Sequence, residues 1–235
     1  MVFDGKKFAQ EIEAELRQKI RRLPKKLKLA IWLEESNQAG KKYVAKKMDM
    51  AERLGVEVVL NKVTGDEDGV VVQLPHTNSK FLIDLIDRKK DVDGLKEDSP
   101  YQPAVVRAIS AILKEAKEFT DIGSRFTVVG ASGFVGRNVV RELSTVNGEL
   151  TEIDVDNFDL KKLKTADVVI SCTGQAGLIT PDTVKEGVVA IDVGYPRGDF
   201  ATEVAQKAAF FTPVPSGVGP VTVVMLFQNL LDAVS

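Results

Sequence analysis

The segment "VVGASGFVG", residues 128–136, places three glycines between an apolar run and a stretch with helical periodicity. Glycine adopts backbone angles that other residues avoid, so the chain can turn sharply there or approach another group closely. A strand, a glycine turn and a helix in this order begin many nucleotide-binding βαβ units, in which a pyrophosphate lies at the helix N-terminus. The same order also describes a tight turn that binds nothing. The segment predicts an α/β domain with a candidate phosphate-binding turn.

Apolar runs and amphipathic stretches alternate along the rest of the chain, which is typical of α/β proteins with mainly parallel sheets. Before residue 120 we expect helices at 8–23, 39–55, 79–89 and 103–119, and strands at 26–34, 56–63 and 68–75. Residues 125–154 indicate strand, glycine turn, helix and strand, followed by strands at 166–174, 188–196 and 208–214 and a last helix at about 220–234. The pattern predicts two α/β domains, the second a Rossmann-like, doubly wound parallel sheet.

The first domain is expected to be discontinuous, because the last helix follows the second set of strands and can pack back on the first domain. We place this domain at residues 1–118 plus 216–235, and the Rossmann-like domain at residues 119–215.

Composition excludes several classes of function. The net charge of −2 gives no electrostatic support for binding nucleic acid or a membrane surface. The longest apolar run is too short to span a bilayer, and the first residues resemble neither a signal nor a transit peptide. The single cysteine, Cys172, fits a reducing compartment, and we expect a cytoplasmic protein. One histidine and one cysteine exclude a zinc cluster built from these residues, and we expect no metal.

The glycine turn and the strand after it indicate a dinucleotide cofactor. The predicted cofactor-binding residues of the turn are Gly130, Ala131, Ser132, Gly133, Val135, Gly136 and Arg137. Asp154 follows the next strand, where a carboxylate can accept hydrogen bonds from the adenosine ribose and repels a 2′-phosphate. This favours NAD over NADP, although Arg137 can still reach a phosphate. The alternative for Asp154 is a solvated acidic loop that binds no ribose. Thr173, Gly174, Asp192 and Gly194, which end two later strands, are predicted to line the same site.

The first domain carries a set of polar residues suited to a flat, hydrogen-bonding substrate. Tyr43 and Lys47 lie four residues apart and so share one helix face. Gln73 ends an apolar strand, and Asp93 lies in a tight turn with Asp91. The neighbouring lysines also fit an ordinary solvated helix face, so these residues alone leave the function open.

A series of motifs favours a substrate site over an ordinary solvated helix face for these residues. The segments "FDGKKFAQEI", "YVAKK", "DGVVVQLP", "KKDVDG", "VVGASGFVG", "ADVVISCTGQAG", "VVAIDVG" and "TPVPSGVGPVTVVML" occur in one order over nearly the whole chain. Together they resemble the bifunctional methylenetetrahydrofolate dehydrogenase/methenyltetrahydrofolate cyclohydrolase (FolD) family, of which this is a shortened member. The resemblance implies a homodimer paired through the cofactor domain, with a folate cleft between two α/β domains. It also implies a nicotinamide cofactor on the second domain, with NADP as the family default, whereas Asp154 favours NAD.

The resemblance also implies two reactions and the residues that perform them. The first oxidises 5,10-methylenetetrahydrofolate by hydride transfer to the nicotinamide, and the second hydrolyses the methenyl product to 10-formyltetrahydrofolate. Lys47 matches the lysine that assists the attack of water, and Gln73 matches its hydrogen-bonding partner. Tyr43 matches the tyrosine that stacks on the aminobenzoate ring, and Asp93 the aspartate that binds the pterin. Further residues expected to line the folate site are Leu74, Pro75, Gly217, Gly219, Pro220 and Thr222, of which Thr222 is also predicted to cap the last helix.

The chain departs from the family pattern at several positions. The family usually has serine, threonine, arginine and glycine at four positions where this chain has, in the same order, Gly40, Gln102, Ala131 and Ser216. The helix that usually connects the strands at 56–63 and 68–75 is missing. Alternatives are therefore a dehydrogenase without cyclohydrolase activity, or a non-catalytic module that binds folate or nucleotide.

Overall fold

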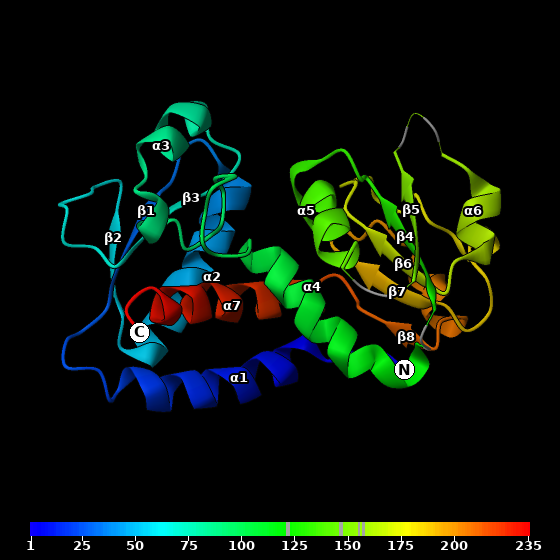
Figure 1. Ribbon diagram of the computed structural model, residues 1–235, viewed down its shortest axis with the longest axis horizontal. Coiled ribbons are helices and arrows are strands. Elements are labelled where there is room, and N and C mark those ends of the chain that lie inside the picture. Colours follow the sequence, from blue (N-terminus) through cyan, green and yellow to red (C-terminus); the bar gives the residue numbers. More distant parts are fainter. Residues whose placement is uncertain (121–122, 146–147, 155, 157) are drawn as a thin grey trace. The chain divides into compact units, whose positions relative to one another are not determined.

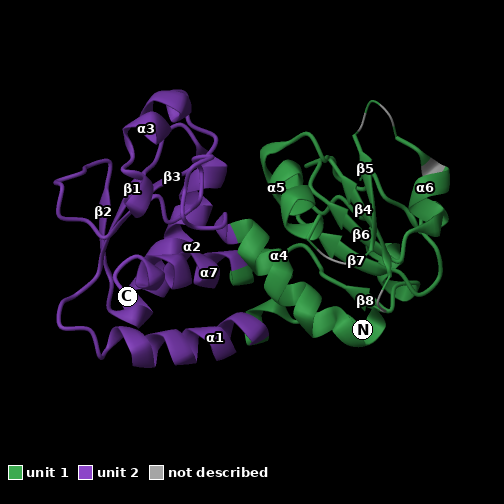
Figure 2. Cartoon of the chain, viewed as in Figure 1, with its two compact units in different colours: residues 1–7, 105–221 green, residues 8–104, 222–235 purple. Residues whose placement is uncertain are grey.

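The computed structural model describes residues 1–235 except 121–122, 146–147, 155 and 157. It divides into two compact units (Figure 2). Unit 1 comprises residues 1–7 and 105–221, and unit 2 comprises residues 8–104 and 222–235. Both are discontinuous, because the chain passes between them several times. The helix expected at 103–119 falls mainly in unit 1, and residues 121–122 of the segment after it lie outside the described residues.

Unit 2 is built on a parallel sheet of order β2-β1-β3 (Figure 1). Its elements are α1 (Gly5–Ile20, beginning in unit 1), β1 (Lys28–Trp32), α2 (Gln38–Leu54), β2 (Glu57–Leu60), β3 (Gly69–Val72), α3 (Ser79–Leu85), the 3-10 helix η1 (Arg88–Lys90) and most of α7 (Val218–Asp232). Every residue of β3 is buried, as its unbroken valine run predicts. A Cβ on Gly69 would lie 2.7 Å from Leu230 of α7, so glycine allows this helix to pack closely on β3.

The connection from β2 to β3, residues 61–68, contains no helix, which confirms the shortening expected from the sequence. Glu67 organises this segment: its side chain accepts hydrogen bonds from Thr64 Oγ1 at 2.8 Å, from Gly65 N at 2.9 Å and from Thr64 N. Glu67 is only 2% exposed. Its burial alone would raise its pKa, but the hydrogen bonds from Thr64 and Gly65 outweigh it and lower the pKa to about 2.

Replacing Glu67 by Gln is expected to lower the free energy of unfolding at neutral pH by about 1.5–3 kcal/mol, since charged acceptors make the stronger hydrogen bonds. The folded-state pKa of Glu67 lies below its unfolded value, so its contribution is full above about pH 4.5 and is lost as the pH falls toward 2. Urea unfolding at pH 7 and pH 3 tests this. If the free energies of unfolding of wild type and Glu67→Gln differ by the same amount at both pH values, the stabilising role of the Glu67 carboxylate is contradicted.

Unit 1 is built on a parallel sheet of order β5-β4-β6-β7-β8. Its elements are most of α4 (Ala104–Glu115), the 3-10 helix η2 (Ala116–Phe119), β4 (Arg125–Val129), α5 (Phe134–Leu143), β5 (Glu149–Ile153), α6 (Leu160–Thr165), β6 (Val168–Ser171), η4 (Pro181–Thr183), β7 (Val189–Asp192), η5 (Thr202–Gln206) and β8 (Phe210–Phe211). In Figure 1, α5 and α6 lie on opposite sides of this sheet. Right-handed crossovers require this, because β5 and β6 lie on opposite sides of β4. The doubly wound fold expected from the sequence is confirmed.

Both sheets have a point where the strand order reverses, and ligands of α/β proteins bind at such points, beyond the carboxyl ends of the strands. In unit 1 the reversal lies between β4 and β6, and in unit 2 between β1 and β3. The glycine turn follows β4, and Thr173 and Gly174 follow β6. Gln73 follows β3. The fold therefore brings predicted site residues to the switch point of each sheet.

Candidate active site

Unit 2 brings together three of the four predicted catalytic side chains. Lys47 Nζ donates a hydrogen bond to Gln73 Oε1 at 3.1 Å and lies 3.6 Å from Asp93 Oδ2. The Lys47 side chain is only 7% exposed, whereas Asp93 is 21% exposed. Gln73 Nε2 donates to Leu74 O at 3.0 Å, which fixes the amide so that its oxygen faces the lysine. A nearly buried cation is thus held between an amide and a carboxylate.

Each member of this set is positioned by a separate part of the fold. Lys47 lies on α2, and Gln73 N donates to Trp32 O at 2.8 Å, which extends the pairing of β3 with β1 by one residue. Asp91 does not take part directly. Its buried carboxylate accepts hydrogen bonds from Leu95 N at 3.1 Å and Lys96 N at 2.8 Å, and so shapes the turn that carries Asp93. Burial raises the pKa of Asp91.

Asn229 was not predicted from the sequence. It is fully buried in α7, and its Nδ2 donates to Val92 O at 2.8 Å and Gln102 O at 2.9 Å. It therefore holds the backbone on both sides of the loop that includes Asp93. The sequence signal for it was an asparagine inside the apolar run of the last helix. Such a residue is expected to be buried, and a buried amide needs hydrogen-bond partners.

Tyr43, Leu74 and Pro75 stand at the edge of this set. Tyr43 is half-buried on α2, one helical turn before Lys47, with Lys46 Nζ 5.4 Å from its ring centroid. Leu74 is 38% exposed, and the Leu74–Pro75 peptide bond is cis. Asn37 Nδ2 donates to Pro75 O at 2.8 Å, which ties this exposed segment to the start of α2.

In unit 1 the glycine turn has the geometry of a backbone cradle. Gly130 has a φ of 82°, and a Cβ on Gly136 would lie 2.0 Å from Gly130 O, so glycine is required at both positions. Gly133 is the N-cap of α5 and offers no side chain to its free N–H groups. Of the other predicted turn residues, Ala131 is buried, Val135 is half-buried, and Ser132 and Arg137 are exposed. The turn leaves the helix N-terminus free for an anion.

Asp154 is joined directly to this turn. It follows β5, and its Oδ1 accepts hydrogen bonds from Ser132 N at 3.0 Å and Ser132 Oγ at 2.8 Å. The carboxylate thus lies beside the predicted cofactor-binding turn. The Arg137 guanidinium lies 5.5 Å from the Phe134 ring centroid on α5.

The two residues predicted at the end of β7 are part of the scaffold of the sheet edge. Asp192 is 1% exposed, and its carboxylate accepts hydrogen bonds from Gly194 N at 2.9 Å, Asp199 N at 3.0 Å and Phe200 N at 3.1 Å. Burial raises the pKa of Asp192. A Cβ on Gly194 would lie 2.5 Å from Asp199 Oδ1, so a side chain does not fit there.

The prediction that Thr222 caps the last helix is wrong. Helix α7 begins at Val218, which places Thr222 inside it and Gly219 and Pro220 in its first turn. Proline is tolerated there because the first N–H groups of a helix have no partner within it. Gly217 lies in the turn before the helix, where its N donates to Pro213 O at 2.7 Å and a Cβ would lie 2.6 Å from the same oxygen.

Ser216 has a φ of 90°, in the region that favours glycine. Serine stands here where the family usually has glycine, and its backbone is strained in the loop before α7. Replacing Ser216 by Gly is expected to raise the free energy of unfolding by about 1 kcal/mol, because glycine removes the Cβ conflict. Chemical denaturation of both proteins tests this, with Ser216→Ala as the control that removes the hydroxyl but keeps the Cβ. A lower stability of Ser216→Gly would contradict the strain.

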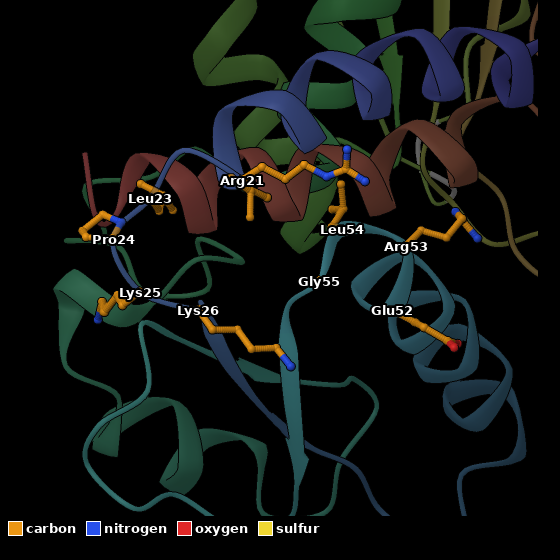
Figure 3. A pocket seen from close by; sticks show the side chains of 10 residues that line it. Arg21, Leu23, Pro24, Lys25, Lys26, Glu52, Arg53, Leu54 and Gly55 are labelled. Atoms are coloured by element: carbon orange, nitrogen blue, oxygen red, sulfur yellow. The ribbon is translucent and has the colours of Figure 1, made fainter.

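A separate open pocket of about 430 Å³ lies in unit 2 (Figure 3). Its lining includes Lys26, which precedes β1, and Gly55, which precedes β2, so it lies at the amino ends of the strands. Gln73 follows the carboxyl end of β3. Two of the cations in the lining are already paired, Arg53 with Glu13 at 3.0 Å and Lys25 with Asp68. No predicted site residue lines this pocket, and it is not the candidate active site.

Two kinds of site are absent from the described residues. The described residues contain no group of His, Cys, Asp and Glu side chains arranged to hold a metal ion. Within the same residues, no helix combines the length and apolar character needed to cross a bilayer.

Comparison with known proteins identifies the family of this chain. Residues 103–235 match the family described as "Tetrahydrofolate dehydrogenase/cyclohydrolase, NAD(P)-binding domain". The "Bifunctional protein FolD" of Acholeplasma laidlawii is 34% identical, with 98% of this chain and 96% of that protein covered. The chain belongs to the tetrahydrofolate dehydrogenase/cyclohydrolase family. The alignment spans 272 positions, more than the 235 residues of this chain, as expected of a shortened member.

Solved structures of this family have the same fold. The bifunctional FolD methylenetetrahydrofolate dehydrogenase/cyclohydrolase of Campylobacter jejuni gives a TM-score of 0.90 at 27% identity, over 99% of this chain and 98% of that chain. The FolD enzyme of Trypanosoma brucei, complexed with NADP cofactor and an inhibitor, gives 0.88 at 26% identity, over 99% and 96%. The family resemblance expected from the motifs is confirmed.

Proposed function

We propose that this chain oxidises 5,10-methylenetetrahydrofolate with NAD(P)+ and hydrolyses the methenyl product to 10-formyltetrahydrofolate, as one enzyme of one-carbon folate metabolism. The observation that carries both activities is the contact set of Lys47 with Gln73 and Asp93 in unit 2, together with the glycine cradle in unit 1. A binding module has no need of a nearly buried lysine held in this way. The contact set also remains although the connection from β2 to β3 lacks its helix, which argues against a dehydrogenase without cyclohydrolase activity.

The hydrolytic step adds water to the methenyl carbon, opens the ring to the formyl product and releases one proton. We assign assistance of the attacking water to Lys47, whose Nζ is oriented by Gln73 Oε1. Asp93, the more exposed partner, is assigned to the pterin, where a carboxylate can accept hydrogen bonds from ring N–H groups. Tyr43 supplies an aromatic face for the aminobenzoate ring, and Leu74 and Pro75 supply apolar contact. Gly217, Gly219, Pro220 and Thr222 are further candidate substrate contacts.

The residues of unit 1 fit a dinucleotide cofactor. Side chains would obstruct the cradle at Gly130 and Gly136, and α5 offers free N–H groups to a pyrophosphate. Asp154 is assigned to the adenosine ribose, and Thr173, Gly174, Asp192 and Gly194 to the strand ends that border the site. When bound, NAD(P)+ supplies a hydride acceptor. Hydride transfer needs positioning rather than a protein acid or base, and the chain's part in this step is to orient the two reactants.

The central prediction of this function is that the two half-reactions can be measured separately on the purified chain. Reduction of NAD+ or NADP+ should require methylenetetrahydrofolate, and decay of methenyltetrahydrofolate should be faster with the protein than without it, in the absence of any cofactor. Catalysis of neither half-reaction would leave only a binding module.

Two further features follow from family membership and composition. We propose that the chain forms a homodimer that pairs through unit 1, as the family resemblance implies. We also propose a cytoplasmic location, which the single cysteine supports.

A further inference from the structure

Asp199 is a fully buried carboxylate that none of the assignments above uses as a site residue. Its Oδ2 accepts hydrogen bonds from Ser171 Oγ at 2.7 Å, Thr173 N at 2.7 Å, Thr173 Oγ1 at 2.9 Å and Gly174 N at 3.3 Å. Its Oδ1 is buried and has no hydrogen-bond partner among the described residues. One oxygen therefore accepts hydrogen bonds from the end of β6 and from both residues of the turn that follows.

The backbone around Asp199 is fixed independently of these bonds. Asp199 N donates to Asp192 Oδ1 at 3.0 Å, and Ile179 N donates to Asp199 O at 3.0 Å. Asp192 ends β7, and Ile179 forms an isolated bridge with Phe200. The carboxylate of Asp199 is thus a rigid anchor, and the turn at 173–174 is the part that it holds.

This turn lies directly against the glycine cradle. A Cβ on Gly130 would lie 3.0 Å from Cys172 C and 3.2 Å from Thr173 N, so the two backbones are in close contact. The cradle and the turn are the two sides of the switch point between β4 and β6, where dinucleotides bind in doubly wound sheets. A displacement of residues 173–174 would therefore change the shape of the cofactor site.

We propose that Asp199 is a positioning residue for the nicotinamide cofactor, which acts by holding the Thr173–Gly174 turn against the glycine cradle. The inference rests on the proposed function, since it assumes that the cofactor lies at this switch point. It predicts that loss of the Asp199 carboxylate weakens cofactor binding without a matching loss of methenyl hydrolysis, because Lys47, Gln73 and Asp93, which are assigned to hydrolysis, lie in unit 2 and this step needs no cofactor.

The test is the binding of NADH and NADPH to Asp199→Asn, followed by nucleotide fluorescence. Asparagine has the same shape but only one acceptor oxygen and no charge, so it binds the same donors more weakly. The dissociation constant is expected to rise about 10-fold or more, the scale of losing charge-assisted hydrogen bonds. Methenyl hydrolysis without cofactor should stay within about twofold of wild type.

Asp167→Asn is the matched control for a change that only destabilises unit 1. Asp167 precedes β6, at the opposite end of the strand, and pairs with Arg125 at 3.2 Å and with Lys185. This variant should unfold at a lower temperature than wild type, with unchanged cofactor binding. If Asp199→Asn does not fold, Ser171→Ala, which removes one donor to Oδ2, replaces it and should weaken cofactor binding about threefold.

The results separate the inference from the function on which it rests. Unchanged cofactor binding by Asp199→Asn, or by Ser171→Ala in its place, would overturn the positioning role. If the variant loses cofactor binding and methenyl hydrolysis to the same extent, the positioning role is also overturned, since general unfolding has this effect. A wild-type chain that hydrolyses methenyltetrahydrofolate but binds neither nucleotide would contradict the cofactor site itself.

Discussion

Replacement of Lys47 by Met is expected to lower the rate of methenyltetrahydrofolate hydrolysis by about 10²–10⁴-fold, the usual contribution of a positioned group that assists proton transfer. Methionine has a similar length but cannot donate to Gln73 Oε1 or assist the attack of water. Methylenetetrahydrofolate-dependent reduction of NAD(P)+ should be retained in part, because hydride transfer does not need the lysine. Stopped-flow absorbance of the methenyl form measures both effects.

Lys42→Met is the matched control for this variant. Lys42 is an exposed lysine on the same helix, and its removal changes the net charge equally. It should leave both reactions unchanged. Equal loss of hydrolysis and hydride transfer in Lys47→Met would show that Lys47 supports substrate binding or folding, and would contradict its assigned role in hydrolysis.

Cofactor preference is expected to shift by about 10–100-fold toward NADP+ when Asp154 is replaced by Arg. The Asp154 carboxylate lies beside the glycine turn, bound to Ser132, and we propose that it favours a free ribose there and repels a 2′-phosphate. Arginine reverses the charge and can bind a phosphate through charge-assisted hydrogen bonds. The ratio of kcat/KM for NAD+ to that for NADP+ measures the shift.

Two controls separate this effect from simpler ones. Glu152→Arg introduces the same charge change at an exposed position of β5 and should shift the ratio little. Asp154→Asn removes the charge without adding one and should fall between wild type and Asp154→Arg. An unchanged ratio in Asp154→Arg, or an equal shift in Glu152→Arg, would count against the assignment of Asp154 to the ribose.

Much of the fold could be predicted because its signals are local. The valine run in β3 indicates a fully buried strand, and Gly55 after α2 has the left-handed conformation of a helix C-cap, with φ of 75°. The contact of Lys47 with Gln73 could be expected from family motifs, but composition and spacing alone left those residues open to a solvated helix face.

The parts that could not be predicted depend on contacts between distant residues. Asp199 lies far along the chain from Ser171, and only the pairing of the strands brings them together. The sequence prediction placed the start of α7 too late because threonine is a common N-cap, whereas the helix begins at Val218, directly after the turn at Gly217. The strain at Ser216 has no sequence signal other than the family's glycine at that position.

The most direct test of the central claim is a single progress curve of the wild-type chain with methylenetetrahydrofolate and either NAD+ or NADP+. Absorbance of the reduced nucleotide and of the methenyl form is followed together, and 10-formyltetrahydrofolate is quantified at the end. We predict that reduced nucleotide and formyl product form in equal amounts, with the methenyl form as a transient. Absence of methylenetetrahydrofolate-dependent reduction of both nucleotides would contradict the account.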